Sequence, residues 1–239
     1  MRNGGWILLL SLLAAVTTTV AACGRHDVAV EYYGYRPFSS SEQRSIQRIA
    51  DTAAIDVRNV LPALPRRLVL RVRTGTDVMP ETGEGASALP PDMVIWTVDR
   101  MRTEGVQQII ERQLRGTLFH EFHHLVRFAT GGPMTLMDHV ISEGMATAFE
   151  RDFGKTKPEW GQYPADVADW VGELVSGSKG ASQNEWLFRH PDGRRWVGYR
   201  AGTFLVDQAM AESKQSSADM ITMPTADVIA LALRYQVGR

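Results

Sequence analysis

Residues 117–128 read TLFHEFHHLVRF and contain a His-Glu-x-x-His pattern at His120, Glu121 and His124. In a helix, positions i and i+4 lie on one face about one turn apart, so two imidazoles at this spacing can bind one metal ion. The carboxylate beside the first histidine can reach a water molecule on that ion. The pattern therefore predicts two zinc ligands, His120 and His124, and a general base, Glu121.

Apolar residues recur at helical spacing through this stretch and just before it. They are Val106, Ile110, Leu114, Leu118, Phe122 and Leu125. Such a stripe predicts an amphipathic helix over 106–125 that packs into the core along its apolar side. The two histidines fall beside the stripe, where they can turn toward a cleft.

A catalytic zinc site usually has three protein ligands and one water, so a third ligand is needed. Glu143 lies nineteen positions after His124, in a second predicted helix over 136–150. The turn residues Gly131-Gly132-Pro133 separate the two helices and let them pack side by side. We therefore predict Glu143 as the third ligand. Gly144 follows it, and a helical glycine costs about 1 kcal/mol relative to alanine, which suggests close helix contact or room for the metal site.

Other ligand assignments are compatible with the spacing. His123 lies three positions after His120 and could replace His124. In that case the motif carboxylate loses its usual relation to the histidine pair. Two further polar residues on the face of the third ligand are expected to be outer hydrogen-bond partners or structural groups. They are His139 and Glu150.

Three blocks together resemble a family of predicted zinc-dependent proteases in the thermolysin-like, glutamate-liganded group. The blocks are His120-Glu121-Phe122-His123-His124, Ser142-Glu143-Gly144-Met145-Ala146 and Val197-Gly198-Tyr199-Arg200-Ala201-Gly202. The resemblance covers roughly residues 65–210. It implies a zincin-like α+β fold with one Zn²⁺ per chain, held by His120, His124 and Glu143. It also implies that Glu121 is the base and that Tyr199 lies near the cleft.

Such a site would hydrolyse peptide bonds. Zinc supplies a water whose pKa is lowered from about 15.7 toward 7, and it polarises a carbonyl oxygen. Glu121 is expected to take the proton of that water and pass it to the leaving amine. The charge that develops on the substrate oxygen needs a further donor, for which Tyr199 is the candidate. Arg127 and Arg200 are the alternatives, and a tyrosine that only packs is the other interpretation of Tyr199.

The first 22 residues are typical of a secretory signal of the lipoprotein type. A positive start at Arg2 precedes an apolar run over 6–16. The ending Val20-Ala21-Ala22-Cys23 resembles the bacterial lipobox, and Cys23 is the single cysteine of the chain, so no intrachain disulfide can form. We predict lipidation at Cys23; the alternative is cleavage near Ala22 with an incidental cysteine. The predicted location is the cell envelope. By the same resemblance, Gly24 after the lipidated cysteine, in place of Asp, favours sorting to the outer membrane if the host is diderm.

Composition excludes some partners. The chain has 26 Lys and Arg against 27 Asp and Glu, and no basic cluster, so nucleic acid is not an expected partner. No apolar run of 18 residues follows the signal, so no spanning helix is expected. The predicted organisation is a signal at 1–22, a tether and first strand at 23–35, and one metalloprotease domain at 36–239. The expected partners are a peptide or protein substrate and the lipid bilayer.

The other elements follow from periodicity and turn residues. Strands are predicted at 28–33, 67–73 and 92–99, and helices at 39–60, 166–175, 199–210 and 225–235. The turn-rich stretches 74–91, 152–164 and 177–195 are expected to be loops. The resemblance implies a small sheet ahead of the motif helix, with an edge strand along the cleft. Residues 94–97 are either that edge strand or a central one.

Two other functions fit the same sequence. One is a non-catalytic zinc-binding envelope lipoprotein, a scaffold or sensor in which the metal holds two helices together. The other is an anchored envelope protein whose motif is accidental. Metal content and the effect of Glu121→Gln separate these from a peptidase.

Overall fold

A computed structural model describes residues 26–34, 37–177 and 182–237, so the predicted signal and Cys23 lie outside the described residues. Four strands form one sheet in the order β1-β2-β4-β3. They are β1 (Val28–Tyr33), β2 (Leu68–Thr74), β3 (Glu84–Leu89) and β4 (Met93–Val98). β1, β2 and β4 run parallel, and β3 runs antiparallel to β4.

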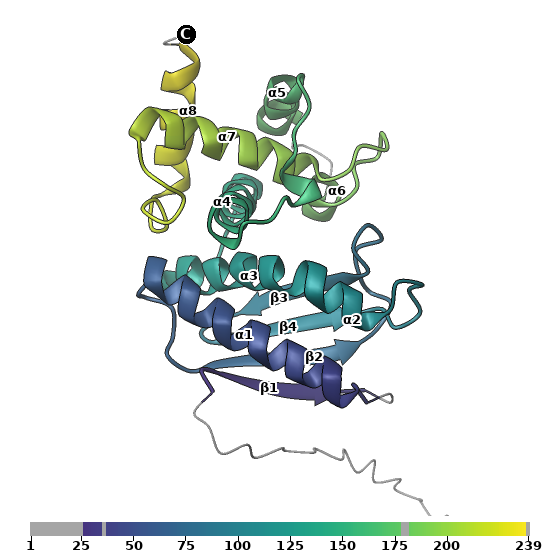
Figure 1. The fold of residues 1–239 in the computed structure, drawn as a ribbon. Helices are drawn as coiled ribbons and strands as arrows, with labels where there is room; N and C mark the ends of the chain where they lie inside the picture. The colour runs from purple at the N-terminus through teal and green to yellow at the C-terminus, as the bar shows by residue number, and fades with distance from the viewer. Residues whose placement is uncertain (1–25, 35–36, 178–181, 238–239) are drawn as a thin grey trace, which may run out of the picture.

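Buried and more exposed side chains alternate along the strands, so one face of the sheet is buried. Its buried side chains are Val28, Leu68, Leu70, Val72, Val94, Trp96 and Val98. They face α1 (Ser40–Val60) and the motif helix, which cover this side of the sheet (Figure 1). α1 begins at a capping box in which Ser39 accepts from the Glu42 backbone N–H, while the Glu42 carboxylate accepts from the Ser39 backbone N–H. The opposite face of the sheet is left without a helix layer in this view.

The prediction that residues 74–91 form only a loop was wrong, because they contain β3. Of the two alternatives for residues 94–97, the central strand is correct: β4 lies between β2 and β3. β3 is therefore the edge strand on the motif-helix side. Its sequence, Glu-Gly-Ala-Ser-Ala-Leu, has little intrinsic strand preference, so pairing with β4 rather than propensity makes it a strand.

The motif helix is longer and less regular than its pattern predicts. It consists of α2 (Val106–Ile109), a π-helical turn over Ile110–Leu114 and α3 (Arg115–Arg127). The apolar residues that defined the stripe repeat mostly every fourth position, which drifts around a regular helix of 3.6 residues per turn. A wider turn absorbs that drift, so the stripe stays on the buried side.

The C-terminal half is helical, as predicted. It contains α4 (Leu136–Gly154), α5 (Val167–Gly177), α6 (Gln183–Leu187), α7 (Val197–Ser213) and α8 (Thr225–Val237). Short 3-10 turns lie at Phe128–Thr130 and Glu159–Gly161. α6 falls within the stretch predicted as a loop at 177–195, so that prediction was wrong in part. The protein is thus α+β, with a small sheet followed by a mostly helical half, and no described helix could cross a membrane.

α4 and α7 cross at two glycines. A Cβ placed on Gly144 would lie 2.3 Å from the carbonyl carbon of Gly202, and one on Gly202 would lie 2.0 Å from the Val140 oxygen. Both distances are far inside van der Waals contact. Close helix contact, one of the two reasons suggested for Gly144, therefore applies, and it fixes the part of α4 that carries Glu143.

Candidate metal centre

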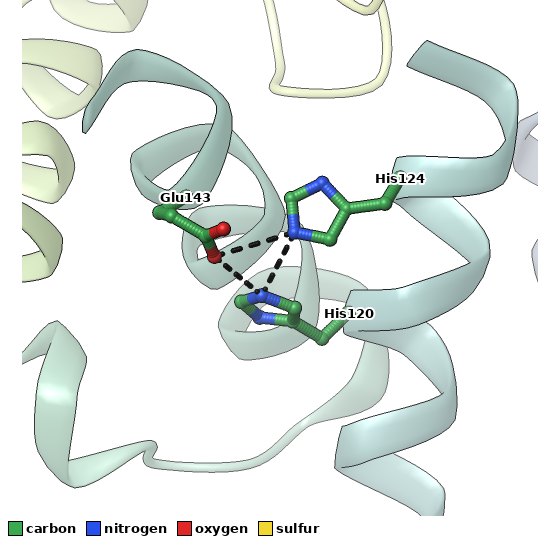
Figure 2. Close-up of side chains that lie close together, drawn as sticks. All are labelled: His120, His124 and Glu143. Atoms are coloured by element: carbon green, nitrogen blue, oxygen red, sulfur yellow. Dashed lines mark hydrogen bonds and ion pairs between the residues drawn. The ribbon is translucent and has the colours of Figure 1, made fainter. Parts of the chain in front are cut away.

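The three predicted ligands converge on one point. His120 and His124 project from consecutive turns of α3, and Glu143 projects from α4 toward them (Figure 2). The Nε2 atom of His120 lies 3.0 Å from Oε2 of Glu143 and 3.2 Å from Nε2 of His124. The Nε2 atom of His124 lies 3.3 Å from the same Oε2 atom. Among the described residues, these three side chains form a group of the His, Cys, Asp and Glu type that could hold one metal ion.

The donor set and its spacing fit zinc. Two imidazole nitrogens and a carboxylate are ligands of catalytic zinc sites, at about 2.0–2.2 Å from the ion. Ligand atoms at that distance in a tetrahedron stand about 3.3 Å from one another. The separations of 3.0, 3.2 and 3.3 Å match this value. A site of this kind would leave a fourth position for water.

Glu150 lies behind the first histidine, at its Nδ1 side. Its Oε2 atom lies 3.4 Å from Nδ1 of His120, and its Oε1 atom accepts from the Thr156 hydroxyl at 3.0 Å. This supports its prediction as an outer partner, since a ligating imidazole normally has a carboxylate or carbonyl at its other nitrogen. Burial alone would lower the pKa of His120. The carboxylates of Glu143 and Glu150 outweigh burial and hold that pKa well above its ordinary value.

Glu143 is held as a carboxylate. Burial by itself would raise its pKa, but His124 and His120 overcome that effect and hold the pKa far below its usual range. An ionised carboxylate is the form that binds a cation. The local charge therefore favours the ligand role.

Glu121 is buried beside the ligands and faces the edge strand. Its side chain lines the same cleft as the two histidines and Glu143. Burial raises its pKa, and the two neighbouring histidines and a backbone hydrogen bond with Ala88 of β3 oppose that rise. A carboxylate with a raised pKa is a better proton acceptor than an exposed one. The position and the environment agree with a general base.

Tyr199 also lies at the centre. Its ring stacks with the His120 ring at 6.2 Å, and its hydroxyl interacts with Glu143. Burial, followed by the charges of Glu143 and Glu121, raises its pKa well above the ordinary value, so the hydroxyl stays a donor. The other two donor candidates do not line the cleft. Arg127 instead donates to the Ser142 hydroxyl and to the carbonyls of Ile221 and Met223.

The competing histidines are not in the ligand group. His123 is fully buried against the Phe149 ring at 5.3 Å, and burial lowers its pKa well below the ordinary value. Neither of its ring nitrogens has a hydrogen-bond partner among the described residues. His139 lines the cleft without joining the three predicted ligands. The structure thus selects His124 over His123.

A cleft of about 680 Å³ contains the centre. One wall is formed by β3 and the loop before it, and the floor by α3. The other wall belongs to the C-terminal half and is mainly aromatic: Trp160, Phe188, Trp196 and Tyr199. Trp196 lies 5.5 Å from Tyr199 and 5.8 Å from Phe188, ring to ring. Phe188 is 43% exposed, so an apolar surface is open beside the metal centre.

The free edge of β3 faces this cleft. The Gly83 carbonyl accepts from the Asp99 N–H toward β4, whereas the Glu84 carbonyl accepts from the Met79 N–H on the other side. Backbone groups of successive strand residues alternate in direction, so Ala86 and Ala88 also point their N–H and C=O groups away from β4. The Ala88 N–H donates to Glu121, and the other outward groups can pair with an extended chain.

Two features of the centre were not found in the sequence. Glu84 is a fully buried carboxylate of β3 that accepts from Trp96 Nε1 at 2.7 Å and from the Thr117 hydroxyl at 3.2 Å. It joins the edge strand to the motif helix. Arg195 pairs with Glu81 at 3.0 Å and joins the two cleft walls. Both are contacts between distant segments, and a single charged residue in a loop-like stretch gives no signal for them.

A family model described as predicted Zn-dependent protease (DUF2268) matches residues 39–230, so the chain belongs to this family. The matched region contains all three predicted ligands, Glu121 and Tyr199. No curated protein and no solved structure matches the chain. The family description names zinc, and the grouping of His120, His124 and Glu143 could hold such an ion.

Proposed function

We propose that this protein is a membrane-anchored zinc metallopeptidase that hydrolyses peptide bonds with Glu121 as the general base. The observation that supports it best is the convergence of His120, His124 and Glu143 to 3.0–3.3 Å, with Glu121 buried beside them. Two ligands and the base come from one helix, and the third ligand is fixed by the close crossing of α4 and α7.

The chain supplies the following roles. A zinc ion held by the three ligands would provide a water of lowered pKa and polarise a carbonyl. Glu121 would accept a proton from a water molecule beside it and pass it to the leaving amine, which the raised pKa of its carboxyl favours. Tyr199 donates its hydroxyl proton in a hydrogen bond to the substrate oxygen as charge develops there. Glu150 keeps the His120 ring oriented through its Nδ1 atom.

The substrate class follows from the cleft. An extended peptide can pair with the outward N–H and C=O groups of Ala86 and with the Ala88 carbonyl, while the Ala88 N–H donates to Glu121; this places its next peptide bonds along α3. The aromatic wall opposite β3 would then receive its apolar side chains. An edge strand on one side and an apolar wall on the other suit a polypeptide rather than a small polar molecule.

The decisive test separates metal binding from hydrolysis. We expect wild-type protein to hold one zinc per chain, His124→Ala to lose it, and Glu121→Gln to keep it. In Glu121→Gln we expect cleavage of a casein or peptide-library substrate to fall by at least about a hundredfold. Elemental analysis after desalting gives the metal content. Full turnover in Glu121→Gln would contradict the mechanism, and bound zinc without turnover in the wild type would favour the scaffold or sensor.

We further propose that Cys23 is lipidated and anchors the protein in the cell envelope, on the periplasmic side of the outer membrane in a diderm host. The lipobox-like ending at Cys23, followed by Gly24, supports this. Incorporation of labelled palmitate into the full chain, and its absence in Cys23→Ser, tests the anchor independently of the metal centre.

A further inference from the structure

The chain enters the domain at one end of the sheet, a border formed by the ends of the strands and not by an edge strand. The three parallel strands begin at this edge, and antiparallel β3 ends there. We call it the entry edge and define it by Val28, Leu68, Leu89 and Met93. Cys23 precedes Val28 by five positions. The entry edge is therefore the part of the described structure closest along the chain to the proposed lipid.

The connection between lipid and edge is very short. The His26 imidazole lies 2.7 Å from Oδ2 of Asp51, and the Val28 N–H donates to Oδ1 of the same carboxylate. The chain is thus tied to α1 from His26 onward. Two residues separate His26 from Cys23, so the three steps between their Cα atoms span at most about 11 Å. A lipid on Cys23 would hold the entry edge against the head groups of a bilayer.

The open face of the sheet carries an apolar row at this edge. Four residues are cross-strand neighbours in register: Ala29, Val69, Met93 and Leu89. Their side chains point away from the buried face, because residues one position along each strand line the core. Leu89 is 43% exposed, and Val69 and Met93 are partly exposed. The apolar row is therefore open to solvent where the chain enters.

Positive charge lies beside this row. Arg66 and Arg67 immediately precede β2, and both are exposed. Arg58 donates to the carbonyls of Pro65 and Arg66 at 3.1 and 3.0 Å, which fixes the backbone of this turn. Neither guanidinium of the Arg66-Arg67 pair has a partner within the described ranges.

Three acidic residues lie near the same edge in the part of the chain that the structure describes. Asp51 is the one that is held by His26 and the Val28 N–H. Asp27 is paired with Arg58 at 3.2 Å, which offsets its charge. Asp92, just before β4, is partly buried. The edge therefore presents two free positive charges next to an apolar row, a combination that suits an anionic lipid surface.

We propose that the entry edge, with Arg66, Arg67 and the apolar row, lies on anionic phospholipid head groups and orients the domain on the bilayer. This contact is additional to the lipid anchor. The proposed lipidation accounts for the presence of the protein at a membrane, and the contact itself does not require it. The contact also orients the cleft. Glu84 contacts Thr117 and Ala88 contacts Glu121, so β3 and α3 run in the same direction toward the entry edge, and the part of the cleft lined by Ala88 and Phe128 is the part nearest to it. The substrates that reach it best are polypeptides at the membrane surface.

The test uses the chain from Gly24 onward, without lipid, which keeps every described element. Flotation with phosphatidylglycerol-containing vesicles should carry the protein, and phosphatidylcholine vesicles should carry much less. Arg66→Ala/Arg67→Ala should weaken the partition coefficient by roughly tenfold or more. Leu89→Ser, at an exposed position, should weaken it by about threefold.

The matched control is Arg44→Ala/Arg48→Ala, which removes two exposed arginines from consecutive turns of α1. A partition coefficient of this control within about twofold of the wild-type value supports the proposal. Three results would overturn it: no partition onto any vesicle, wild-type partition of Arg66→Ala/Arg67→Ala, or an equal loss in the control. A dimer that Leu89→Ser disrupts, with vesicle binding unchanged, would instead assign the row to a second copy. Neither zinc nor hydrolysis enters this measurement, so its failure would leave the proposed peptidase intact.

Discussion

Tyr199 differs from the other aromatic residues of the cleft because its hydroxyl faces Glu143 while its ring packs on His120 and Trp196. Tyr199→Phe keeps the ring and removes the donor. We expect kcat to fall by about a hundredfold, with KM and zinc content little changed. Peptide-hydrolysis kinetics measure this. Tyr163→Phe is the control, because its hydroxyl donates to Asp207 outside the cleft; equal kinetics for both variants would leave Tyr199 as a packing residue.

Glu84 makes stability depend on pH. Burial raises the pKa of its carboxyl to about 7, and hydrogen bonds from Trp96 and Thr117 only partly oppose this. The folded protein therefore favours the protonated form. This contribution to stability is complete below the unfolded value near 4.5 and is lost as pH rises through about 7.

Glu84→Gln should remove this pH dependence. Between pH 5 and pH 8 the wild type should lose about 2 to 3 kcal/mol of unfolding free energy that the variant keeps. Denaturant unfolding at the two pH values measures the difference. Glu159→Gln, at an exposed position, should follow the wild type. Parallel pH profiles for the wild type and Glu84→Gln would show that Glu84 does not titrate in this range.

The close crossing of α4 and α7 predicts a stability effect at the scale of elements. Gly144→Ala forces a Cβ against the Gly202 backbone, which cannot move without shifting α7. We expect a loss of about 2 kcal/mol or more in unfolding free energy. Zinc affinity should fall as well, because Glu143 is the adjacent residue. Denaturant unfolding and zinc titration measure the two effects.

The control for this crossing is Gly172→Ala in α5. A Cβ there meets nothing within 4 Å, so the substitution should leave zinc binding unchanged and add up to about 1 kcal/mol of stability. If Gly144→Ala behaved in the same way, the two helices would have more freedom than their packing indicates.

The helices, and the convergence of His120, His124 and Glu143, were predictable because their signals are local. The i, i+4 histidines and the apolar stripe fix the motif helix, and the glycine-rich turn places Glu143 on a neighbouring helix. β3 was not predictable, because its residues form a strand only when β4 pairs with them. For the same reason the backbone edge at Ala86 and Ala88, and the buried carboxylate of Glu84, could not be read from sequence alone.

At the scale of the whole molecule, the residues of the candidate metal centre come from two halves of the chain. His120 and His124 belong to the helix that packs on the sheet, and Glu143 belongs to the helical half. Their joint binding of an ion should stabilise the pairing of the two halves. At a free zinc concentration about a hundred times Kd, the gain is about 2.7 kcal/mol.

Removal of zinc should therefore lower the melting temperature. For a domain of this size we expect a fall of about 5–10 °C on chelation, which zinc restores. Differential scanning fluorimetry measures it. His124→Ala should melt at one temperature with or without chelator. A wild-type melting temperature that ignores chelator would mean that zinc does not link the halves.

The π-helical turn over Ile110–Leu114 also constrains how this chain can change in length. It accommodates one residue more than a regular turn, so a one-residue deletion there could be absorbed as ordinary α-helix. The hydrogen bonding would become regular, and Val106 and Ile109 would keep roughly their direction relative to His120 and His124, because the wider turn already accommodates the residue that is removed. An insertion in the same turn would have a different result, since one further residue rotates everything before it by about 100° and would turn Val106 and Ile109 out of the core. An insertion between residues 110 and 114 is therefore a change in the aim of the histidines, although it lies outside the site, whereas a one-residue deletion there is not.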